Sequence, residues 1–178
     1  PMNTILKKLA GGDLRSIGRS NEVVTEVLAD PRLFGALFEG MLDADPLIRM
    51  RAADAVEKIT AQHPEYLASF KSKLIRQIAK SDQQEVRWHV AQLFSRLALS
   101  LAERRVVAGI LSEYLKDESR IVKTFSMQAL ADIAEKGEEL RAPIVTQLEK
   151  LTRTGSPAMK SRGRKLLAKL KPKPAKKA

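Results

Sequence analysis

Apolar residues recur along this chain with the spacing of amphipathic helices, and the same pattern returns four times. In four segments that align without gaps, an apolar anchor residue is followed by a basic residue and by apolar residues at offsets 8 and 11. The segments are residues 45–59, 83–97, 119–133 and 156–170, with anchors Ile48, Val86, Val122 and Met159. The anchors are 38, 36 and 37 residues apart. At about 100° per residue the apolar offsets form one stripe, so each segment is predicted to be a helix.

A second helix is predicted before each of these segments. Apolar residues at helical spacing place it at about residues 31–42, 64–80, 101–116 and 139–152. The unit is therefore a helix pair that repeats about every 37 residues. Asp45 before Pro46 is a typical helix start, because its side chain can cap the first turn. Offset 4 is mostly small, as expected where helices approach closely, and is occupied by Ala52, Val90, Ser126 and Gly163.

The second helix of the first pair reads Asp-Pro-Leu-Ile-Arg from Asp45 and continues with small and apolar residues to Ile59. With the repeat period, this motif resembles the HEAT-repeat family, most closely its short bacterial form. Glu85-Val86-Arg87 fits the same motif, whereas the last two units replace its Arg with Lys. The resemblance implies an all-α, right-handed α-solenoid of about four helix pairs. The repeats would span about residues 30–62, 63–99, 100–135 and 136–170.

The ends of the predicted domain, residues 1–170, depart from the repeat. Residues 3–29 have a helical pattern that includes Ile17 and is interrupted by Gly11-Gly12, and they are predicted to form an N-terminal helical cap. The fourth unit has Gly163 and Arg164 where the family has small apolar residues. A terminal capping repeat with a polar outer face is expected to differ in this way.

The chain has a formal net charge of +11, and nearly all of it lies at the C-terminal end. Residues 152–178 hold ten Lys and Arg and no acid, so residues 1–151 have a net charge of only +1. Residues 171–178 alternate Lys with Pro and are predicted to be a disordered basic tail. This end is expected either to contact nucleic acid non-specifically or to act as a solubilising cap. The basic residues of the last predicted helix are Lys160, Arg162, Arg164, Lys165 and Lys169.

Composition excludes several kinds of site. The chain has no Cys and only two His, so it offers no disulfide framework, thiol nucleophile or Cys-based zinc site. It contains no Gly-rich phosphate loop, G-x-S-x-G elbow or H-E-x-x-H motif. No apolar run approaches the roughly 18 residues of a membrane span. We therefore expect a monomeric cytoplasmic protein without catalytic residues, cofactor or metal.

In HEAT-like arrays the second helices line a concave surface, and the resemblance implies the same here. Offsets 2 and 6 lie opposite the predicted core and would face that surface. The only Trp, Trp88, would then be an aromatic anchor flanked by Met50. Alternatively, Trp88 packs on a neighbouring helix. The predicted partner-binding residues are Met50, Asp54, Trp88, Gln92, Thr124 and Gln128.

The charged residues of the second helices allow more than one interpretation. Those at offset 1 either follow phosphates or bond loop acids such as Asp82, Asp117 and Asp45. His89 is a candidate general base or pH sensor, but an exposed, solvated histidine is the simpler interpretation. Asp54 and Glu57, one turn apart, favour an acidic patch over a catalytic pair. The basic residues at offset 1 are Arg49, Arg87, Lys123 and Lys160.

Three functions are compatible with this pattern. The first is a non-enzymatic scaffold that binds a protein or peptide through its concave surface. The second is DNA binding, as in the related HEAT-like alkylpurine DNA glycosylases, for which Trp88, Asp54 and Arg87 are residues of the right type. The motif of those enzymes is not matched residue by residue, and the near-neutral body argues against a DNA-wrapping groove. The third, a HEAT-like bilin lyase, rests on repeat similarity alone.

Overall fold

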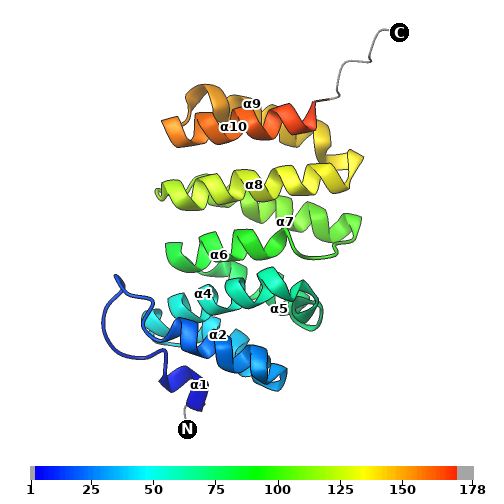
Figure 1. The fold of residues 1–178 in the computed structure, drawn as a ribbon. Helices are drawn as coiled ribbons and strands as arrows, with labels where there is room; N and C mark the ends of the chain where they lie inside the picture. The colour runs from blue at the N-terminus through cyan, green and yellow to red at the C-terminus, as the bar shows by residue number, and fades with distance from the viewer. Residues whose placement is uncertain (1–2, 172–178) are drawn as a thin grey trace. The chain divides into compact units, whose positions relative to one another are not determined.

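The computed structural model describes residues 3–171, and within that range the chain forms helices and no strand (Figure 1). The chain divides into two compact units, Pro1–Ala98 and Leu99–Ala178. The single domain predicted for residues 1–170 stays a prediction. Residues 172–178 of the predicted basic tail lie outside the described residues.

The first unit begins with a short helix and a loop, and continues with helices that pack in pairs. Residues 8–19 form the loop, called the N-terminal loop below, between the first two helices. The unit's α-helices are α1 (Thr4–Lys7), α2 (Ser20–Ala29), α3 (Phe34–Glu39), α4 (Pro46–Gln62), α5 (Lys71–Arg76) and α6 (Gln84–Phe94). Its 3-10 helices are η1 (Pro31–Leu33), η2 (Gly40–Leu42), η3 (Pro64–Phe70) and η4 (Ile78–Lys80).

Local sequence accounts for where these helices begin and how closely they pack. The Asp45 side chain accepts a hydrogen bond from the Leu47 N–H at 2.8 Å, which caps α4 ahead of Pro46. A Cβ at Gly40 would lie 2.6 Å from Leu6 Cδ2 and 3.0 Å from Ala52 Cβ. Glycine is therefore needed where η2 crosses α1 and α4. Small residues at the closest approach let α4 pack against its partner, as offset 4 predicts.

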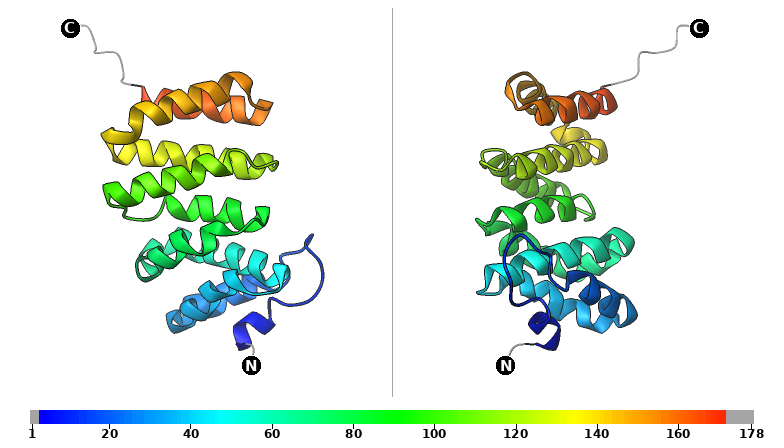
Figure 2. Two further views of the ribbon diagram at one scale, coloured as in Figure 1. Left: turned by 180° about the vertical axis from the view of Figure 1, so that it is seen from behind. Right: turned by 60° about the vertical axis from the view of Figure 1, so that its left-hand side comes forward.

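The second unit consists of two helix pairs. It contains α7 (Leu101–Tyr114), α8 (Arg120–Lys136), η5 (Glu138–Leu140), α9 (Arg141–Thr154) and α10 (Pro157–Leu170). Figure 2 shows α7 and α9 in one layer of this unit and α8 and α10 in the other. A capping box between Ser100 and Glu103 starts α7, and the Ser156 hydroxyl accepts from the Met159 N–H at the start of α10.

The predicted sequence of helix pairs is confirmed, with two local differences. The helices predicted at 31–42 and 64–80 are each broken into a 3-10 turn, a short α-helix and a second 3-10 turn. The helical role predicted for Ile17 is wrong, because Ile17 lies in the N-terminal loop and is 41% exposed. The buried apolar residues of α2 are instead Val23 and Val27.

Candidate functional site

A single buried arginine of α4 holds the N-terminal loop in place. Arg51 is 1% exposed, and its guanidinium donates only to backbone carbonyls of the loop. Nη1 donates to the carbonyls of Leu9, at 2.7 Å, and Gly11, at 2.5 Å. Nε donates to Ser16 at 3.0 Å and Nη2 to Asp13 at 3.1 Å. The side chain thus ties several points of the loop to one helix.

The loop needs glycine where it passes the guanidinium. Gly12 and Gly18 have φ values of +85° and +55°, which L side chains rarely adopt. A Cβ at Gly18 would lie 2.9 Å from Arg51 Cζ, and one at Gly12 would lie 3.2 Å from its Nη2. Backbone conformation and space therefore both favour glycine at these two positions.

The loop forms one wall of a hollow of about 290 Å³, and α4 and α6 form the rest. Leu14 and Ile17 of the loop are 49% and 41% exposed, and Trp88 of α6 is half-buried. The lining residues used below are Leu14, Ile17, Met50, Asp54, Glu85, Trp88 and His89, and this site is called the Trp88 hollow. The hollow therefore has polar as well as apolar lining residues, and its apolar Leu14 and Ile17 are open to solvent.

The structure brings three predicted partner-binding residues together in the Trp88 hollow. Met50, Asp54 and Trp88 all line it, although they come from two different repeats. Met50 is not exposed as predicted: it is only 7% exposed, because the N-terminal loop covers this part of α4. Gln92 is half-buried farther along α6.

Asp54 is the centre of a small polar network. Its Oδ2 accepts from the Ser20 hydroxyl at 2.6 Å and from Lys58 Nζ at 2.7 Å. The neighbouring carboxylate of Glu57 pairs with Arg96 at 2.5 Å. The predicted acidic patch is wrong, because each of the two carboxylates already has a cationic partner within hydrogen-bonding distance.

His89 is buried between this network and its own helix, so the exposed histidine predicted from sequence is wrong. It is 9% exposed, with Nδ1 2.6 Å from the Glu85 carbonyl oxygen and Nε2 3.8 Å from Asp54 Oδ1. Since a carbonyl only accepts, Nδ1 carries the proton. Burial lowers the pKa of His89 and outweighs the opposing effects of the Glu85 hydrogen bond and the Asp54 charge. The ring is therefore neutral at pH 7.

The side chains of Ser20, His89 and Asp54 do not form a nucleophilic relay. The Ser20 hydroxyl is buried and donates to Asp54 rather than to His89. A serine nucleophile needs a histidine base within hydrogen-bonding reach of its own oxygen. Within residues 3–171, no group of three or more His, Cys, Asp or Glu side chains could hold a metal ion.

The basic residues at offset 1 of the first two pairs bond to neighbouring loops. Arg49 donates from Nη1 to the Asp43 carbonyl and from Nε to Gln83 Oε1, each at 2.8 Å. Arg87 donates from Nε to the Ser81 carbonyl at 2.7 Å. Arg49 thus donates to carbonyl and amide oxygens, where the sequence suggested a carboxylate such as Asp45. The corresponding Lys123 and Lys160 are half-buried.

In the second unit, two predicted site residues contact one another. Arg162 of α10 donates from Nη1 to Gln128 Oε1 of α8 at 2.9 Å. Gln128 Nε2 donates in turn to Asp132 at 3.0 Å. Thr124, one turn earlier on α8, is half-buried and donates its hydroxyl hydrogen bond to the Arg120 carbonyl at 2.9 Å. The bond between Arg162 and Gln128 joins α10 to α8 through side chains, whereas Thr124 bonds within α8.

Sequence reasoning missed the N-terminal loop and its anchor. Arg51 occupies offset 3, which a helical wheel places at the edge of the buried stripe and does not mark as special. The available signal was the set of three glycines at positions 11, 12 and 18, because a glycine-rich segment can wrap closely around a side chain.

The comparisons with known proteins bear on the repeat itself. A family model described as a HEAT repeat domain matches residues 13–170. The chain belongs to the HEAT-repeat family. No curated protein matches this HEAT-repeat chain. In residues 3–171, no helix is both long and apolar enough to cross a membrane. The family match covers α2 to α10 and all the residues that line the Trp88 hollow.

Proposed function

We propose that this HEAT-repeat protein is a non-enzymatic interaction module that binds a protein or peptide partner through the Trp88 hollow. The observation that carries the proposal is a wall of exposed Leu14 and Ile17 beside half-buried Trp88. Exposed apolar side chains grouped around a hollow mark interaction sites more often than scattered ones do. Trp is also the residue type most enriched among side chains that dominate binding energy.

The size and stiffness of the hollow favour an extended peptide segment. A volume of about 290 Å³ lies at the lower end of the range for ligand pockets and suits one or two apolar side chains. The wall is held by the buried Arg51, so little conformational entropy is lost when a partner binds. The lining includes both Glu85 and Arg15, so the hollow selects for an apolar side chain rather than for one sign of charge.

The DNA-glycosylase alternative is less compatible with this hollow. A glycosylase-type site would use a carboxylate that can act on its substrate, and Asp54 is already bonded to Ser20 and Lys58. The basic residue expected to hold DNA there, Arg87, donates to the Ser81 carbonyl instead.

The proposal is tested with fluorescein-labelled peptides selected from a random displayed library on the wild-type protein. We expect Trp88→Ala and Leu14→Ser each to weaken binding by about tenfold or more, as measured by fluorescence anisotropy. Ile121→Ala, at a residue that is 47% exposed in the other unit, is the matched control and should bind normally. Leu14→Ser is included because exposed Leu14 can be changed with little effect on folding. Unchanged binding by a folded Leu14→Ser and a folded Trp88→Ala would overturn the proposal.

A further inference from the structure

The last helix pair carries positive charge that the fold leaves largely unpaired. Six Lys and Arg side chains are exposed there: Lys150 and Arg153 on α9, Arg164, Lys165 and Lys169 on α10, and Lys171 directly after it. These six residues are called the basic surface. Of the six, and among the residues that the structure describes, only Lys171 has an ion pair, with Glu149 at 3.7 Å.

Three exposed arginines of the first unit, in contrast, have an acidic partner close by in the sequence. Arg15 and Arg32, with side chains 91% and 89% exposed, each pair with an acid two residues away at 2.8 Å. Arg19 pairs with Glu22 at 2.6 Å. Glu149 is the last acid in the sequence, so the residues after it offer no side-chain carboxylate to the basic surface. The positive charge is thus concentrated where an external anion is needed to neutralise it.

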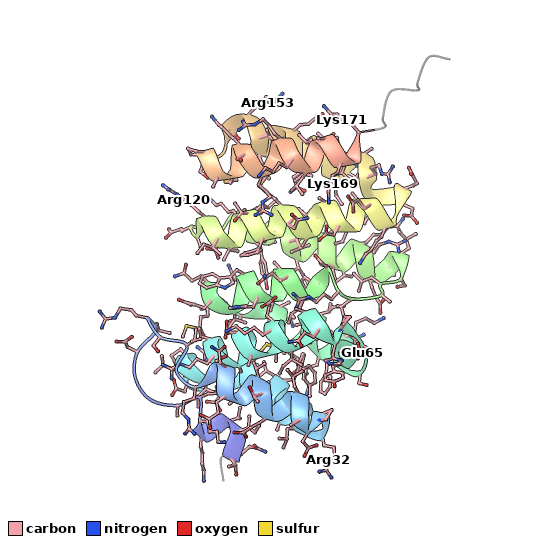
Figure 3. All side chains as sticks on the ribbon, in the orientation of Figure 1. Arg32, Glu65, Arg120, Arg153, Lys169 and Lys171 are labelled. Carbon is pink, nitrogen blue, oxygen red and sulfur yellow. The ribbon has the colours of Figure 1, made fainter. Side chains whose placement is uncertain are left out.

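Helix geometry arranges the exposed side of α10 as a row of small residues between flanking cations, called the track below. At 100° per residue, its angular order is Arg164, Ala168, Ser161, Lys165 and Lys169. Small side chains therefore lie along the middle, with Arg164 on one flank and Lys165 and Lys169 on the other. Figure 3 shows Arg153 and Lys171 at the edge of the pair that faces away from α8, and Lys169 on the side toward α8.

The dimensions of this track suit a nucleic-acid backbone. The 14 residues of α10 span about 21 Å at 1.5 Å per residue. Duplex DNA presents one phosphate charge per roughly 1.7 Å of its axis, which is about 12 charges over that length. A phosphate ridge can lie on the small residues while the flanking cations replace its counterions. Neither α9 nor α10 contains an aromatic residue, so base stacking on a single strand is not supported.

The same helix pair is unsuited to a lipid surface. An interfacial helix inserts an apolar face into the headgroup region. The large apolar residues of α10 are buried, and none of the exposed large hydrophobic residues among the described positions lies on α9 or α10. We infer that the basic surface binds the phosphate backbone of duplex nucleic acid without sequence specificity. This inference is independent of the Trp88 hollow.

The test measures anisotropy of a fluorescein-labelled 20-base-pair DNA duplex with the full chain across a NaCl series. The variant Arg164→Gln/Lys165→Gln/Lys169→Gln should weaken binding by roughly tenfold or more. Its slope of log Kd against log salt should fall by about 2 to 3, since each phosphate contact contributes roughly 0.9. The matched control, Arg32→Gln/Arg76→Gln/Lys80→Gln, removes three exposed cations of the first unit and has the same net charge. It should keep the wild-type slope to within about 0.5.

Three results would overturn the inference. The first is an equal loss in both triple variants, which would make net charge alone responsible. The second is unchanged binding by the α10 variant together with loss in Lys173→Gln/Lys176→Gln/Lys177→Gln, which would assign binding to the C-terminal residues instead. The third is tighter binding, at the same salt concentration, to phosphatidylserine vesicles or to a single-stranded 20-mer than to the duplex.

Discussion

The side chain of Arg51 links two distant parts of the chain by donating hydrogen bonds to backbone carbonyls. It lies in the middle of α4, yet all of its hydrogen-bond acceptors are carbonyls of the N-terminal loop. A fully buried guanidinium is stable only when its donors are satisfied. The carbonyls supply this without a carboxylate, so we expect the path of the loop to depend on this side chain.

Replacing Arg51 with Met should lower the free energy of unfolding by about 1 to 3 kcal/mol. Met has similar length but leaves the buried Leu9 carbonyl without its donor. Urea unfolding followed by circular dichroism measures the change. Arg76→Met, at an exposed residue of α5, is the control and should change stability by less than about 0.5 kcal/mol. Identical midpoints for the two variants would show that the loop does not depend on Arg51.

His89 should make the protein less stable in mildly acidic solution. Its folded pKa lies below the ordinary value of 6.5, so the unfolded chain binds the proton more readily. The contribution of neutral His89 is therefore complete above pH 6.5 and is lost as the pH falls through the folded pKa. Asp54 and Glu57 oppose the effect, and Lys58 adds to it.

The measurement is the melting temperature at pH 7.5 and pH 5.5. The melting temperature of wild type should fall more between pH 7.5 and pH 5.5 than that of His89→Gln, which cannot titrate at this position. His63→Gln, at an exposed histidine beside Glu65, should behave as wild type does. Parallel losses in wild type and His89→Gln would rule out a contribution from His89.

The sequence predicts which side chains share a helix face. It does not predict which of them are buried by a distant segment of the chain. The wheel places Met50 and Trp88 on the same face, and the structure puts both in one hollow. The wheel also leaves Met50 and His89 exposed, because it has no information on the N-terminal loop beside Met50 or on the Asp54 network beside His89. Burial of these two residues is a tertiary property that periodicity does not contain.

At the scale of helices, the boundaries that can be predicted from the sequence are those marked by capping residues and proline. Proline and capping residues before α4 and α10 were visible, and both helices begin where they indicate. The 3-10 breaks around α3 and α5 were not visible, because apolar spacing over 12 to 17 residues fits a continuous helix equally well. In residues 64–80, Phe70 at the end of η3 packs on Phe38 of α3, with ring centroids 4.5 Å apart. Tertiary packing therefore acts at the point where the 3-10 helix ends.

Two glycine substitutions should have opposite effects on stability. Gly163→Ala should cost about 1 to 3 kcal/mol, because its Cβ would lie 1.9 Å from Thr152 Oγ1 and 3.0 Å from Thr152 Cβ. Gly109→Ala in α7 meets nothing within 4 Å and should stabilise by up to about 1 kcal/mol through helix propensity. Urea unfolding of both variants provides the comparison. A stabilising Gly163→Ala would contradict the close approach of α9 and α10.

At the scale of the whole molecule, the two proposed surfaces differ in chemistry and in the unit that carries them. The Trp88 hollow is built from residues of the first unit, and the basic surface from residues of the second. The charge asymmetry behind this division was readable from the sequence, since ten Lys and Arg and no acid occur in residues 152–178. Which of these cations are exposed depended on the packing of α10 against α8 and α9.

The two surfaces should bind their ligands independently. Trp88 is the only Trp, so its emission reports on the hollow alone. Adding saturating DNA duplex should leave this emission, excited at 295 nm, unchanged, and Trp88→Ala should bind the duplex as wild type does. A spectral shift on adding duplex, or loss of duplex binding in Trp88→Ala, would show that the hollow takes part in binding the nucleic acid.

Arg51 holds the backbone of the N-terminal loop, whereas the exposed side chains of the loop are the ones that a partner would contact. Carbonyl oxygens are common to all residues, so the anchoring places no demand on which side chains the loop carries between its glycines. Leu14, Arg15 and Ile17 can therefore be exchanged while the backbone that presents them stays fixed. The first unit can therefore serve as a constant scaffold for a variable recognition loop. New partner preferences could be selected by altering a few exposed positions of that loop.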